Sequence, residues 1–140
     1  MERRIEEELS EDIRVEAPPP PPSPEELLAA QFKGRKADLR PLYDGLVHIA
    51  RRLYPRVRCE PLPNVVRFVA RQPFAVFRAT SAVRADLGLC LGPVSARGRL
   101  RPCKGLGGVD GVTHRIELYG PGDLDADLVR WMKRAIETRS

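Results

Sequence analysis

One glycine-rich stretch of the sequence, residues 97–108, gathers four cationic side chains and no acidic one. The basic residues are Arg97, Arg99, Arg101 and Lys104. Backbone N–H groups of a glycine-rich loop can surround an anion, and Gly105 and Gly107 could supply them here. The stretch lacks the Gly-Lys-Ser/Thr sequence of a nucleotide-binding P-loop. It therefore predicts either an anion-binding loop or a solvent-exposed loop without a ligand.

His114 is the residue best suited to acid–base chemistry, because an imidazole titrates near neutral pH. It alternates with Ile116 and Leu118 on one side of a predicted strand, which favours a buried structural histidine. The alternative that stays open is a catalytic His114. In that case the protein would be an enzyme that acts on a phosphorylated small molecule with the help of the basic loop.

The spacing of the histidines, cysteines and acidic residues gives little support for a metal site or a catalytic carboxylate pair. The two histidines have no partner at metal-ligand spacing, and the three cysteines form no CxxC motif. Asp123, Asp125 and Asp127 are better explained as a helix start, with Asp123 as its cap. Asp86 and Glu117, on outward faces of two strands, could form a carboxylate pair. We expect no metal and no cofactor.

Three helices are expected around these residues. Ser23 and Glu26 form a capping box with Pro24 between them, which predicts the start of the first helix. A second helix is expected from near Asp38 to Leu53, with apolar residues repeating on one face. The third follows Asp123.

Between the second and third helices the apolar residues recur with a period of two, which is typical of strands. Five strands are expected, at Val57–Leu62, Val65–Arg71, Phe74–Thr80, Ala85–Leu91 and Thr113–Tyr119. Most of the gaps are short and favour antiparallel pairing. The predicted class is α+β: an antiparallel sheet of about five strands with two N-terminal helices and one C-terminal helix packed on it.

The N-terminal segment differs from the rest in composition. Residues 1–24 carry a net charge of −4, which leaves +9 on the remainder of a chain whose total is +5. Residues 1–22 also include five consecutive prolines, so we expect a disordered acidic and proline-rich arm before a single domain at residues 23–140. No apolar run approaches the ~20 residues of a membrane span. With three unpaired cysteines, this predicts a cytoplasmic protein.

Several segments together resemble a known family. They are Phe74–Ala79, Ala85–Leu91, Thr113–Leu118 and the start of the last helix at Asp123–Asp125 with Leu128, Trp131 and Ile136. They are similar to the bacterial domain of unknown function 5655, which also occurs at the C-terminus of predicted transport proteins. The resemblance runs from about Pro24 to Glu137 and implies no activity or catalytic residue.

The charge of the folded part gives the leading hypothesis about function. We expect a non-enzymatic binding or interaction module whose partner is an anionic ligand, either a polyanion or a nucleic acid, and not a membrane. The binding residues would be those of the basic loop, with a second cluster at Arg51, Arg52, Arg56 and Arg58 contributing.

Overall fold

The computed structural model describes residues 18–140. Most of the predicted arm lies outside these residues, and its last five, Pro18–Pro22, are exposed and belong to no helix or strand. The first helix, α2 (Pro24–Gln31), begins at the predicted capping box. The backbone N–H of Glu26 donates to Ser23 Oγ at 3.2 Å, and the N–H of Ser23 donates to the Glu26 carboxylate at 3.3 Å.

The second predicted helix has a short 3₁₀ helix in front of it. The 3₁₀ helix η1 (Gly34–Leu39) leads directly into α3 (Arg40–Leu53), so the α-helix starts two residues later than predicted. Pro41 lies in its first turn, where no intrahelical N–H is needed. In the part of the chain that the structure describes, no helix has the length and apolar character required to cross a membrane.

The sheet is antiparallel throughout and confirms the predicted class. Its strands are β1 (Arg58–Pro61), β2 (Val66–Val69), β3 (Pro73–Ala79), β4 (Ala85–Leu89), β5 (Arg101–Pro102) and β6 (His114–Leu118). They lie in the order β1-β2-β3-β4-β6-β5. The five predicted strands are present, with ends shifted by at most two residues. The sixth, β5, falls inside the predicted loop; it is too short to show an alternating pattern.

The last helix starts later than predicted. A 3₁₀ helix, η2 (Pro121–Asp123), separates β6 from α4 (Ala126–Thr138). The residue that caps α4 is Asp125, whose side chain accepts the backbone N–H of Leu128 at 3.1 Å. The predicted cap, Asp123, instead accepts the N–H of Tyr119 at 2.7 Å and so closes the turn before the helix.

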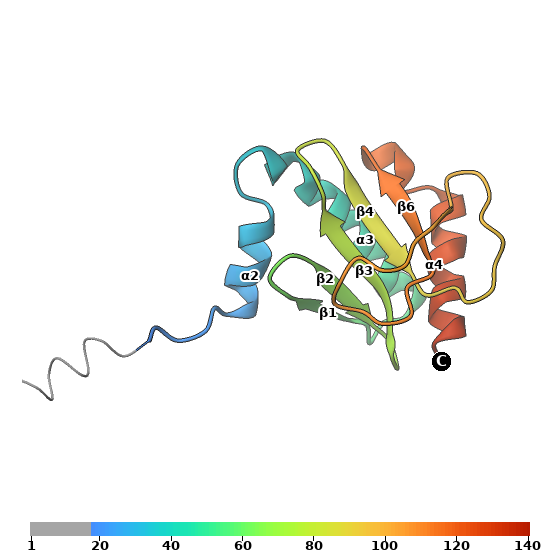
Figure 1. The fold of residues 1–140 in the computed structure, drawn as a ribbon, viewed down its shortest axis with the longest axis horizontal. Coiled ribbons are helices and arrows are strands. Elements are labelled where there is room, and N and C mark those ends of the chain that lie inside the picture. Colours follow the sequence, from blue (N-terminus) through green and yellow to red (C-terminus); the bar gives the residue numbers. More distant parts are fainter. Residues whose placement is uncertain (1–17) are drawn as a thin grey trace, which may run out of the picture.

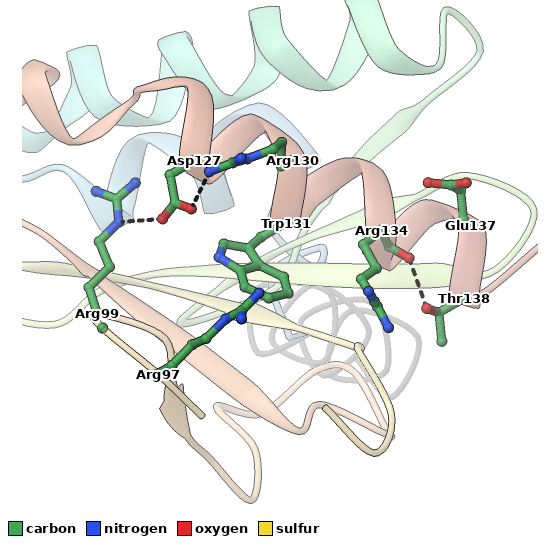
Figure 2. A pocket seen from close by; sticks show the side chains of 9 residues that line it. Arg97, Arg99, Asp127, Arg130, Trp131, Arg134, Glu137 and Thr138 are labelled. Atoms are coloured by element: carbon green, nitrogen blue, oxygen red, sulfur yellow. Dashed lines mark hydrogen bonds and ion pairs between the residues drawn. The ribbon is translucent and has the colours of Figure 1, made fainter. Parts of the chain in front are cut away.

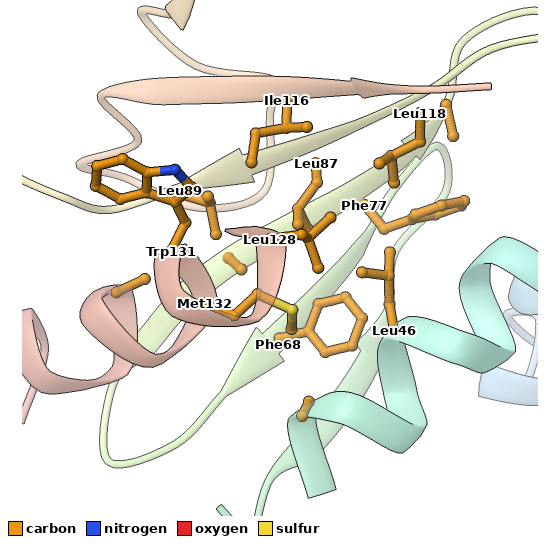
Figure 3. Close-up of a cluster of buried hydrophobic side chains, with 14 of the residues drawn as sticks. Leu46, Phe68, Phe77, Leu87, Leu89, Ile116, Leu118, Leu128, Trp131 and Met132 are labelled. Atoms are coloured by element: carbon orange, nitrogen blue, oxygen red, sulfur yellow. The ribbon is translucent and has the colours of Figure 1, made fainter. Parts of the chain in front are cut away.

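Within residues 18–140, the helices α3 and α4 cover one face of the sheet, here called the helix face. Figure 1 shows α3 behind the strands and α4 beside β6, and Figure 3 shows their side chains meeting those of the sheet. The side chains labelled there are Leu46, Phe68, Phe77, Leu87, Leu89, Ile116, Leu118, Leu128, Trp131 and Met132. All of them are buried, and Trp131, the most exposed, has an exposed fraction of only 8%.

The opposite, outer face of the sheet is partly covered by the loop between β5 and β6 (Figure 1). A second cluster of buried side chains forms there, here called the outer cluster. Its members are Val65, Val76, Cys90, Val109 and Val112, with Leu62, Cys103 and Leu106 packed against them. The loop approaches the sheet closely at Gly88. A Cβ atom at that position would lie 2.8 Å from Val76 Cγ1 and 3.1 Å from both Leu106 Cδ1 and Val112 Cγ1.

Gly88→Ala is therefore expected to loosen the loop over the outer cluster. The added methyl group forces valine and leucine side chains apart, and overpacking of this kind costs about 1–3 kcal/mol. Urea denaturation would measure the loss, and amide exchange of residues 103–112 should become faster. Gly122→Ala is the matched control, because a Cβ there meets no atom within 4 Å. Equal stability of the two variants would contradict the close approach.

A candidate anion-binding groove

An open groove of about 860 Å³ lies between α4 and the turn that precedes β5. Figure 2 shows the groove from close by. Its lining residues are Arg97, Gly98, Arg99, Asp127, Arg130, Trp131, Arg134, Glu137 and Thr138. Four of these nine residues are arginines and two are acidic, so the groove presents more positive than negative charge.

A tight turn places the first two arginines of the basic loop at this groove. The backbone N–H of Leu100 donates to the Arg97 carbonyl at 3.0 Å, and Gly98 adopts a φ of 59°, which an L side chain rarely tolerates. Leu100 is 1% exposed and packs in the main core. With Leu100 anchored in the core, Arg97 and Arg99, on either side of Gly98, line the groove beside α4.

Arg99 is held by the aspartates at the start of α4. Its Nη1 donates to the Asp123 carbonyl at 3.0 Å, its Nη2 is hydrogen-bonded to Asp125, and its Nε lies 3.5 Å from Asp127 Oδ2. The pKa of Asp125 is lowered, first by the hydrogen bond from the Leu128 N–H and then by the charge of Arg99. The charge of Arg99 is thus already compensated, and this side chain fixes the turn against the helix.

The other three arginines leave more charge for a ligand. The Arg97 guanidinium carbon lies 5.7 Å from the centre of the Trp131 ring, in a cation–π arrangement. Arg130 forms one exposed pair with Asp127 at 3.0 Å. Neither Arg97 nor Arg134 lies within 4.0 Å of a carboxylate among residues 18–140. Figure 2 shows Arg97 stacked on Trp131, with Arg134 further along the helix.

The structure does not bring all the predicted loop residues to this groove. Arg97 and Arg99 line it, but Arg101 lies on β5 and its Nε is 3.9 Å from Glu117 Oε2. Lys104 is exposed beyond β5. Gly105 and Gly107 have positive φ angles and belong to the loop over the outer cluster. The second basic cluster, which includes Arg58 on β1, lies toward the opposite edge of the sheet from β5.

His114 lies in the helix-face core and not among the residues that line the groove. Its exposed fraction is 5%. Its Nε2 is 2.8 Å from the Val94 carbonyl oxygen, and its Nδ1 is 2.8 Å from Thr113 Oγ1. Because a carbonyl only accepts, Nε2 carries a proton and donates it to Val94, while Nδ1 is hydrogen-bonded to the threonine hydroxyl. Both ring nitrogens are therefore engaged within the fold.

Asp86 and Glu117 are paired in register on the outer face, as the predicted carboxylate pair requires. Each carboxylate forms ion pairs with arginines, so the two do not form a catalytic pair that is open to a substrate. Asp86 is 2% exposed; it accepts Arg84 Nη2 at 3.2 Å and Arg115 Nη1 at 3.4 Å. Glu117 lies 3.6 Å from Arg115 and accepts the Tyr119 hydroxyl at 2.7 Å. This network is an ion-pair ladder across β4 and β6.

Acidification is expected to destabilise the fold through three carboxyl groups whose pKa values are lowered. A hydrogen bond from Arg67 lowers the pKa of Glu60, and one from Tyr119 lowers that of Glu117; Asp125 is described above. Each stabilises the folded state above its ordinary pKa of 4.5 or 3.8, and this stabilisation is lost as the pH falls through the folded value. Urea denaturation between pH 7 and pH 3 would measure the decline. The Glu60→Gln/Glu117→Gln double variant should show a shallower one, and an identical slope would contradict the assignment.

Sequence reasoning missed part of the groove. Arg130 and Arg134 are four residues apart on α4, so they share a side of the helix with Trp131 between them. Trp131 packs in the main core, and neither arginine is among the binding residues predicted from the sequence. The i, i+4 spacing of the two arginines indicates a basic side of the helix. It does not indicate that the turn at residues 97–99 lies opposite that side.

The fold and groove define a small α+β domain with an antiparallel sheet and an arginine-lined surface beside its last helix. The sequence pattern of the family described as Domain of unknown function (DUF5655) matches residues 28–139, and the chain belongs to that family. No curated protein and no solved structure matches the chain. Among the described residues, no three His, Cys, Asp or Glu side chains are placed to hold a metal ion.

Proposed function

We propose that this domain is a non-enzymatic binding module that holds a phosphate-bearing anion in the arginine groove. The observation that carries the proposal is the set of exposed arginines around Trp131. Arg97 and Arg134 have no carboxylate partner within the described residues, and Arg130 shares Asp127 with Arg99. Planar guanidinium groups with free N–H donors suit phosphate oxygens.

The neighbouring residues support this function by holding the groove open. Arg99 ties the turn to the start of α4, and Leu100 anchors the same turn in the core, so the binding arginines need little rearrangement. The position of His114 gives no support to an enzyme that uses it, because the ring is buried with both nitrogens engaged. A cytoplasmic setting belongs to the proposal too, since all three cysteines are free.

Titration with inorganic tripolyphosphate would test the proposal in the intact chain. Trp131 is the single tryptophan, so its fluorescence should change on binding, and calorimetry would give the affinity. Arg97→Gln or Arg134→Gln is expected to weaken binding about tenfold or more, because a hydrogen bond to a charged group contributes about 1.5–3 kcal/mol. Rising salt should weaken binding as well.

The matched control is Arg35→Gln, which removes an exposed arginine of η1 on the other side of the domain. Its affinity for tripolyphosphate should stay within about twofold of the unaltered protein. The proposal fails if the unaltered protein does not bind at low salt. It fails equally if Arg35→Gln weakens binding as much as Arg97→Gln does, since the attraction would then come from net charge alone.

A further inference from the structure

A second group of arginines lies on the outer face of the sheet, on the other side of the same edge. Arg101 on β5 pairs in register with Arg115 on β6, so both side chains point away from the helices. Arg84 comes directly before β4 and contacts Asp86. The Asp86 carboxylate is buried against the sheet, whereas the Arg101 guanidinium group faces solvent: the Asp86 side chain is 2% exposed and the Arg101 side chain is 61% exposed.

The two groups of arginines are joined by a short piece of chain. Arg97 and Arg101 are four residues apart, and β5 forms the edge of the sheet beyond β6. The turn at Gly98 sends Arg97 toward α4, and the pairing of β5 with β6 turns Arg101 to the outer face. Three arginines on the outer face, Arg84, Arg101 and Arg115, share two carboxylates, so a net positive charge continues around this edge from the groove to the outer face. A small anion can occupy only one side, but an extended chain of phosphates can contact both.

An exposed aromatic ring stands at the end of this path. Tyr119 is 59% exposed and follows β6 on the outer face, where its hydroxyl donates to Glu117. An exposed aromatic ring beside arginines is the kind of surface on which an unpaired base stacks, and each stacked base contributes about 1–3 kcal/mol. A duplex, whose bases are already stacked in pairs, could not use this ring.

We propose that the ligand of the groove is single-stranded nucleic acid. Its backbone runs from Arg97 and Arg134 around the β5 edge to Arg101 and Arg84, and one base stacks on Tyr119. The inference rests on the proposed function, since the groove must bind phosphate for the path to begin there. It adds the class of partner and two contacts, Arg101 and Tyr119, that a small anion would not need.

Fluorescence anisotropy of a labelled oligodeoxythymidylate of about 15 nucleotides would test the path, with tripolyphosphate as the second probe. Arg101→Gln is expected to weaken oligonucleotide binding severalfold and to reduce the slope of log affinity against log salt by about 0.7. Its affinity for tripolyphosphate should be unchanged. Arg97→Gln should weaken both probes, and Arg35→Gln neither.

Tyr119 is tested with a matched pair of variants. Tyr119→Ala removes the ring and should weaken oligonucleotide binding by about fivefold to a hundredfold. Tyr119→Phe keeps the ring and should bind like the unaltered protein. An abasic oligomer of equal length and charge should bind both variants equally, because it has no base to stack. Thermal unfolding of each variant confirms that it is folded.

The outcomes separate the two proposals. Tripolyphosphate binding without oligonucleotide binding, or an Arg101→Gln variant with full oligonucleotide affinity, would overturn the path and leave the groove standing. Equal affinity for a duplex of the same length, or an effect of Tyr119→Ala that persists with the abasic oligomer, would overturn the single-strand assignment. Failure of both probes to bind would overturn the proposed function itself.

Discussion

Replacing Trp131 with alanine is expected to lower the free energy of unfolding by about 3–5 kcal/mol, the range for large aromatic side chains in cores. Trp131 is 8% exposed and packs against the sheet from α4, beside Leu89 and Leu128 (Figure 3). The truncation leaves a cavity between the helix and the sheet. Chemical denaturation followed by circular dichroism gives the loss without relying on tryptophan fluorescence.

The control for Trp131→Ala is Val83→Ala, which truncates an apolar side chain that is 69% exposed. Surface changes of this kind usually stay within about 0.5 kcal/mol. Native tryptophan emission is a second check, since a buried indole emits at shorter wavelength than an indole in water. A water-like spectrum, or a loss below about 1 kcal/mol, would show that α4 does not depend on this side chain.

Asp86→Ala is expected to cost about 2–3 kcal/mol, because the Thr80 hydroxyl and two partly buried guanidinium groups lose their common acceptor. Asp86 accepts the Thr80 hydroxyl together with Arg84 and Arg115, and no other carboxylate within the described residues is as deeply buried. Asp86→Asn should lose less, since the amide oxygen still accepts a hydrogen bond. Denaturation in urea would rank the variants.

An exposed ion pair provides the comparison for Asp86. Asp44 pairs with Arg40 at 3.0 Å on α3, with side chains 59% and 44% exposed. Exposed pairs contribute about 0–1 kcal/mol, so Asp44→Ala should cost little. If Asp86→Ala lowered the free energy of unfolding no more than Asp44→Ala, the ion-pair ladder on the outer face would not contribute to the stability of the fold.

Local patterns explain why most of the fold could be predicted from the sequence. The capping box at Ser23 and Glu26 is a short-range motif, and it forms as predicted. The alternation along Ala85–Leu89 depends only on which side chains share a face, and all five residues are buried in the structure. Such patterns depend on interactions within one helix or strand, so they can be recognised without knowing which segments pack against it.

The features that could not be predicted depend on contacts between distant segments. Arg99 contacts Asp125 across 26 residues, and no local spacing reveals that pairing. The same holds for Asp86: alternation assigned it to the outward face, yet Arg84, Arg115 and Thr80 enclose it there. The shift of the α4 cap from Asp123 to Asp125 reflects a 3₁₀ turn whose hydrogen bonds resemble those of a helix start.

The position of β6 between β4 and β5 has a consequence for the growing chain on the ribosome. Strands β1 to β4 are joined by short turns and can pair as soon as they emerge, whereas β6 pairs with residues 25 to 33 positions earlier in the sequence. Until His114–Leu118 has been synthesised, the β4 edge has no partner and the apolar side chains of β3 and β4 await α4. Non-local pairing is slow and exposes edges that aggregate. The β4 edge is therefore exposed until β6 has been synthesised, and the apolar face of β3 and β4 until α4 follows it.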